Sequence, residues 1–167
     1  MSRLDPWTLQ VQAIAVVAHA HHGRLGLVAE VTGELPAALS ALTADPVPPP
    51  GTLDASAGLT VWSSLLVALA MADIDRSQRA ADVGFARSGA RMIALAERIG
   101  LKNGLYRTMS AARVRQAAQG ADESAYADAV SSYAGLDPEA LRAAVRAALR
   151  ERPGSAVEVP PDQDPRP

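Results

Sequence analysis

The chain has 167 residues, of which 49% are hydrophobic and 20% are charged, and its formal net charge is −2. This length accommodates one domain with a hydrophobic core and is too short for two ordinary domains. The absence of cysteine excludes disulfides, thiolate zinc sites and a cysteine nucleophile. Because the net charge gives no overall attraction to nucleic acid or anionic lipid, such attraction must come from local clusters. We expect a cytoplasmic protein without a membrane span.

The first helix is predicted from its start signal and an apolar stripe. Asp5 has the side chain of an N-cap, and Pro6 suits the first position of a helix that we expect to end near His21. Four apolar residues recur at helical spacing along this segment, which predicts that they face the core: Val11, Ile14, Ala15 and Ala18.

The remainder of the N-terminal part contains two interruptions. Residues 27–45 predict two short helices that are divided near Gly33, with Pro36 in the first turn of the second helix. The prolines of residues 45–52 then exclude a helix and predict a stiff, extended connector.

Five further helices are expected after the connector, at residues 54–72, 76–99, 103–119, 123–134 and 138–151. Glycines at positions 100, 120 and 135 mark predicted helix ends, and Asp122 and Asp137 mark predicted starts. From residue 153 onward the chain is rich in proline and lacks apolar periodicity, which predicts disorder.

These patterns predict an all-α fold, an irregular helical bundle of six or seven helices with a proline-rich connector and a disordered C-terminal tail. No alternation of apolar and polar residues predicts a strand. We expect one helical domain over residues 1–152. Its parts are the N-terminal helices at 1–44, the connector at 45–52 and the main bundle at 53–152, and the tail follows at 153–167.

All three histidines of the chain lie close together, at His19, His21 and His22. In a regular helix His22 lies about 60° from His19, whereas His21 lies on nearly the opposite side, so the three cannot converge on one ion. A metal site using His19 and His22 would need a third ligand, such as Glu30. The alternative, which we favour, is a partly buried His22 stabilised at a helix C-terminus, without metal, cofactor or catalytic role.

Charge is unevenly distributed in the second half of the chain. Nine basic residues and two acidic ones lie between Arg76 and Arg115, whereas nine acids and five arginines lie from Asp122 onward. The basic residues could bind nucleic acid. The explanation that we favour is a solvated arginine-rich face or ion pairs with acids of the C-terminal helices.

Residues 95–109, LAERIGLKNGLYRTM, resemble a helix-turn-helix. Ala96 would lie in the first helix, Gly100 would form the turn, and the second helix would begin near Asn103. A second glycine, Gly104, departs from the usual pattern of the motif. The residues expected to contact DNA are Lys102, Asn103, Arg107 and Arg113.

The predicted helix at 54–72 carries an uncharged run of 18 residues, 55–72, which reaches the lower limit for a membrane span. Its acidic flanks and its serines favour a buried core helix. Apolar residues cover more than one narrow stripe, so this helix must lie at the centre of the bundle or at an interface. The candidate interface residues are Trp62, Leu66 and Leu69.

Three functions are consistent with these observations. We favour a non-catalytic protein-interaction, regulatory or adaptor protein that acts through helix-face contacts and self-associates or binds a protein partner, because nucleophile elbows, phosphate loops and dinucleotide motifs are lacking. The first alternative is a DNA-binding regulator that uses residues 95–115. The second is a metal or small-molecule site at His19 and His22. The sequence favours a protein that is not an enzyme.

Overall fold

The computed structural model describes residues 5–44, 53–101 and 109–154. Within these ranges the chain is helical and contains no strand, which confirms the predicted all-α fold. The predicted connector at 45–52 and residues 155–167 of the tail lie outside the described residues. The elements in chain order are α1 (Pro6–His21), η1 (Leu25–Val28, a 3-10 helix), α2 (Ala29–Ala44), α3 (Leu53–Ala80), α4 (Val83–Ile99), α5 (Ala111–Tyr133) and α6 (Pro138–Glu151).

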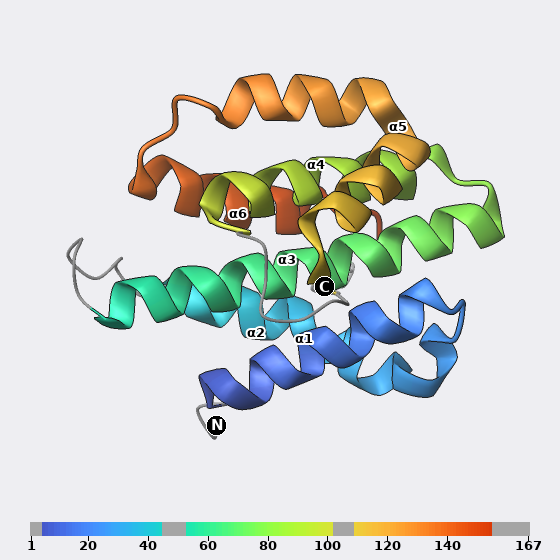
Figure 1. Ribbon diagram of the computed structural model, residues 1–167, viewed down its shortest axis with the longest axis horizontal. Coiled ribbons are helices and arrows are strands. Elements are labelled where there is room, and N and C mark those ends of the chain that lie inside the picture. The colour runs from blue at the N-terminus through green and yellow to red at the C-terminus, as the bar shows by residue number, and fades with distance from the viewer. Residues whose placement is uncertain (1–4, 45–52, 102–108, 155–167) are drawn as a thin grey trace, which may run out of the picture.

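Helix α3 runs through the middle of the molecule. Figure 1 shows α1 and α2 on one side of it and α4, α5 and α6 on the other. Every residue from position 61 to position 74 of α3 is buried. A helix covered on all sides must be apolar around its whole circumference, and this explains why its apolar residues exceed one stripe.

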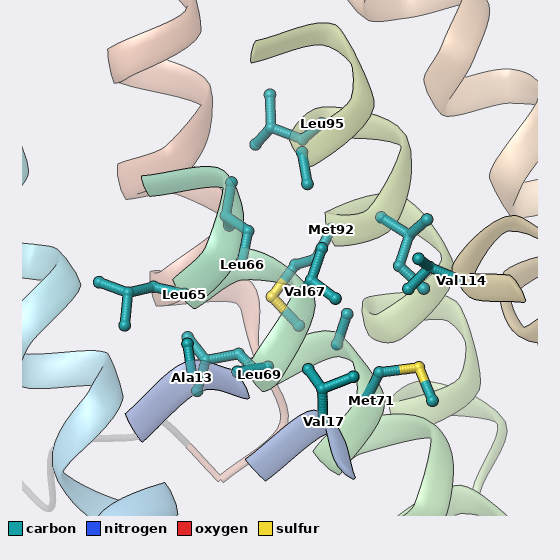
Figure 2. Packing of buried hydrophobic residues seen from close by; sticks show 14 of the residues in the cluster. Ala13, Val17, Leu65, Leu66, Val67, Leu69, Met71, Met92, Leu95 and Val114 are labelled. Carbon is teal, nitrogen blue, oxygen red and sulfur yellow. The ribbon is translucent and has the colours of Figure 1, made fainter. Parts of the chain in front are cut away.

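The core forms where α3 packs between α1 and α4. Figure 2 shows side chains of α3 between Ala13 and Val17 of α1 and Met92 and Leu95 of α4. The residues that the sequence offered as an interface, Trp62, Leu66 and Leu69, belong to this core and are at most 6% exposed. Of the two positions considered for this helix, the centre of the bundle or an interface, the structure has the first. A partner cannot reach these three residues in this fold.

Within residues 5–44, 53–101 and 109–154, two segments are long and apolar enough to cross a membrane by length and composition. Residues 58–80 form most of α3, and 78% of the residues in their most apolar window are buried inside the fold, as expected of a core helix. Residues 25–44 comprise η1 and α2, and only 17% of the corresponding window is buried. The N-terminal part thus has much more apolar surface outside the core than α3 has.

The boundary between α3 and α4 differs from the prediction. We expected a break at residues 73–75, but α3 continues to Ala80, and α4 begins after Asp82, whose carboxylate accepts a hydrogen bond of 2.8 Å from the Gly84 N–H. Ala81 between the helices has a positive φ of 52°. The predicted break was too early, because α3 continues through Asp73 and Asp75.

The other boundaries are partly as predicted. α1 begins after Asp5 and ends at His21, and α6 spans the predicted residues. Helix α2 is one continuous helix across Gly33 and Pro36, because burial of Leu35 and Leu39 outweighs the hydrogen bond that proline removes.

Helix α5 corrects two predicted helices, 103–119 and 123–134. It begins only at Ala111, after Ser110 with a ψ of 119°, and it kinks at Asp122, whose φ and ψ are −156° and 91°. The Asp122 carboxylate accepts a hydrogen bond of 2.9 Å from the Ala125 N–H, so it caps the second half of the helix as expected. Residues 102–108 lie outside the described residues.

The side of α1 that is most buried differs from the predicted one. Its buried residues are Leu9, Ala13, Val16 and Val17, whereas Val11 is 58% exposed and Ile14, Ala15 and Ala18 are half-buried. Of the predicted stripe, Val11 lies on the outside, whereas Ile14 packs partly against the core cluster.

Candidate functional site

A buried ion pair joins α3 to the end of α6. Asp73 is fully buried, and the Arg152 guanidinium donates to both of its carboxylate oxygens, with Nη2 2.6 Å from Oδ1 and Nε 2.9 Å from Oδ2. The Ser88 hydroxyl of α4 donates a further hydrogen bond of 2.9 Å to Oδ2. Because cationic and hydroxyl donors occupy both oxygens, this carboxylate fixes the end of α6 to the core and is not available as a cation ligand.

A second polar cluster joins α4 to α5. The Tyr126 hydroxyl donates to the Glu97 carboxylate, and Arg115 donates to Glu97 Oε1 at 2.8 Å and to the Tyr126 hydroxyl at 3.2 Å. Burial, followed by the hydrogen bond to Glu97, raises the pKa of Tyr126 above its ordinary value. The hydrogen bond to Glu97 also raises the pKa of Arg115. The cluster is therefore strongest with a protonated tyrosine.

Other arginines of the basic region contact the C-terminal helices. Arg87 lies 3.7 Å from the Asp122 carboxylate, and Arg91 lies 3.4 Å from that of Glu151. Arg98 donates to the carbonyl groups that end α5, with its Nη2 2.7 Å from the Leu136 oxygen. These contacts favour the explanation by internal pairing.

The proposed DNA-contacting residues are only partly described. Arg113 is exposed and forms no ion pair with another described residue. Lys102, Asn103 and Arg107 lie outside the described residues. Since Ser110 interrupts the helical backbone, Arg113 belongs to a helix that begins after these positions, so the predicted continuous recognition helix at 103–119 is wrong. DNA binding itself stays a prediction.

The histidines lie at the end of α1. His19 is half-buried and His22 is exposed, which reverses the partly buried His22 that we expected. His21 and His22 line a hollow of about 500 Å3 together with Arg113 and Gln116 of α5. A guanidinium beside imidazoles repels a cation. Among the described residues, no three His, Asp or Glu side chains gather as a metal site, so Glu30 does not complete one with His19 and His22.

The outward side of α1 carries two of the five large hydrophobic residues that are exposed in the described part of the chain. We call it the outer face and define it as Trp7, Val11, Ile14 and Ala18, of which Trp7 and Val11 are exposed and Ile14 and Ala18 are half-buried. Trp7 is 65% exposed and lies one turn before Val11. Helix α1 contains no Asp, Glu, Lys or Arg, so its only titratable side chains are the two histidines of its last turn.

Comparison with protein-family models, curated proteins and solved structures finds no match to this chain.

Proposed function

We propose that the protein is a non-catalytic interaction protein whose copies associate through the outer face of α1. The observation that carries this proposal is that α1 is apolar on two opposite sides. One side packs on α3 through Leu9, Ala13, Val16 and Val17. The other exposes Trp7 and Val11 to solvent. Apolar helix surface of this kind is stabilised when a partner removes it from water.

A second copy of the chain is the partner that this surface suits best. In a two-fold contact the same face lies on both copies, so a face with a net charge would meet a face of the same charge. The outer face has no charge and therefore carries no such penalty. Tryptophan is also among the residues that contribute most to binding at protein interfaces, and Trp7 stands at the start of the face.

The size of α1 sets the expected affinity. Its 16 residues make a helix about 24 Å long and about 10 Å wide. One face of such a helix is smaller than the roughly 800 Å2 per partner of a standard interface. We therefore expect a reversible dimer that dissociates in the micromolar range.

The test is sedimentation equilibrium of the full chain and of Val11→Asp across micromolar concentrations. We expect the natural chain to dimerise and Val11→Asp to remain a monomer, because dimerisation would bury two unpaired carboxylates. Val130→Asp is the matched control: Val130 is 43% exposed on α5, far from the outer face in sequence, and its replacement should leave dimerisation unchanged. Circular dichroism checks that both variants fold.

A natural chain that stays monomeric at the highest concentration would refute the proposal. Equal loss of dimer in the two aspartate variants would place the contact elsewhere.

A further inference from the structure

A groove of about 850 Å3 lies between η1 and α2, the C-terminal half of α3, and the end of α6. It shares no residue with the outer face of α1. Small and apolar residues form part of its lining, which we call the apolar floor, among them Gly33, Pro36 and Ala72. Its charged lining consists of five arginines and one carboxylate: Arg76, Arg79, Arg146, Arg150, Arg152 and Asp75.

Two of these arginines are held by carboxylates. Arg79 forms an ion pair of 2.7 Å with Asp75, and Arg152 forms the buried pair with Asp73. The other three, which we call the groove arginines, are Arg76, Arg146 and Arg150. None of them forms an ion pair with another residue that the structure describes.

The groove arginines come from two of the helices that line the groove, α3 and α6. Arg146 and Arg150 lie one turn apart on α6, so their like charges repel each other. Arg76 on α3 lies over the ring of Phe85 at 5.0 Å from its centre, which holds the guanidinium by a cation–π contact. An anion bound in the groove would reduce the repulsion between Arg146 and Arg150.

We propose that this groove binds a phosphate-bearing organic molecule. Guanidinium groups form paired hydrogen bonds with phosphate oxygens, and the whole lining uses arginine without lysine. The volume falls within the range of sites for small organic ligands and greatly exceeds that of a single phosphate ion. The apolar floor would contact the uncharged part of the ligand, while the groove arginines would bind its phosphates.

The phosphate group can belong to a soluble molecule or to a lipid headgroup, and two probes separate these sources. Isothermal titration calorimetry at low salt measures ATP and pyrophosphate as soluble probes. Flotation with phosphatidylcholine vesicles, with and without phosphatidic acid, measures a membrane-borne phosphate. Binding by either route supports the proposal and identifies the source.

Variants of the groove make the test specific. Arg146→Gln and Arg150→Gln should each weaken binding about 10-fold, because each removes a charge-assisted hydrogen bond. Both side chains are at least partly exposed and unpaired, so we expect both variants to fold. Arg113→Gln is the matched control, since Arg113 is also exposed but does not line the groove, and it should bind like the natural chain.

Two results would overturn the proposal. One is the absence of binding to ATP, pyrophosphate and phosphatidic acid vesicles at low salt. The other is an equal loss of affinity in Arg113→Gln and in the groove variants, because this would indicate attraction to the overall charge of the surface.

Discussion

The two sides of α3 are covered by parts of the chain that differ sharply in charge. The N-terminal hairpin of α1, η1 and α2 contains four charged residues in positions 5–44, whereas the described residues of positions 83–154 contain sixteen. Both parts bury leucine, valine and alanine against α3. The C-terminal part adds the Asp73–Arg152 pair and the Glu97, Arg115 and Tyr126 cluster.

This difference shows that one core helix can hold its neighbours in two ways. Apolar packing holds the hairpin against α3, with one exposed hydrogen bond of 3.3 Å from Arg79 to the Gly23 carbonyl, and the outer face of α1 is uncharged. On the other side, ion pairs add fixed geometry, because a buried charge is tolerated only with its partner in place. Three predictions test this contrast.

The largest effect is expected from the buried ion pair. Asp73→Asn leaves the Arg152 side chain, which is 9% exposed, without its counter-charge. We expect it to lower the free energy of unfolding by about 3–5 kcal/mol in urea denaturation. Asp75→Asn breaks the pair with Arg79, whose side chain is 54% exposed, and should cost about 1 kcal/mol or less. If both variants cost the same, the pair does not fix the C-terminal part.

The hairpin should respond to loss of volume rather than to salt. Leu39 of α2 is fully buried, and Leu39→Ala should cost about 2–5 kcal/mol. Because the interaction that is lost is apolar, the cost should be nearly the same at low and high salt. Leu27→Ala in the same hairpin is the control: its side chain is 73% exposed, and its cost should stay below about 0.5 kcal/mol. A cost for Leu39→Ala that falls steeply with salt would contradict the contrast.

The smallest effect on stability at neutral pH is expected from Tyr126. Its contribution to stability changes at alkaline pH. Because its pKa is raised in the fold, its contribution to stability is complete below about pH 10 and is lost as the pH rises through the raised value. Tyr126→Phe should cost about 1 kcal/mol at neutral pH and should reduce the alkaline loss of stability. Urea denaturation at several pH values measures both effects. The prediction fails if Tyr126→Phe keeps the full alkaline loss of stability.

The sequence correctly predicted features that depend on residues close together in the chain. Asp5 and Asp137 identified the starts of α1 and α6 correctly, because an N-cap bonds to an N–H only three residues away. The predicted boundary near Asp73 was wrong because the helix continues through this residue. The buried carboxylate of Asp73 needs the counter-charge of Arg152, which lies 79 positions later in the chain. No local pattern contains that information.

The sequence did not predict which side of α1 packs on α3, and it did not predict the groove, for a related reason. Two apolar stripes on one helix give no local signal of which one meets α3, although the pairing of Trp7 with Val11 one turn later could have indicated a second contact surface. The groove brings together residues of η1, α2, α3 and α6. The spacing of Arg142, Arg146 and Arg150 at every fourth position was the one available signal of a cationic helix face.

The Asp73–Arg152 contact also orders events during synthesis. A ribosome makes the acid of this pair 79 residues before the base, so a growing chain holds α3 with an uncompensated carboxylate until its last helix is complete. Nascent and prematurely terminated chains therefore cannot bury α3 as the finished protein does, and proteases should digest such chains faster than the finished one.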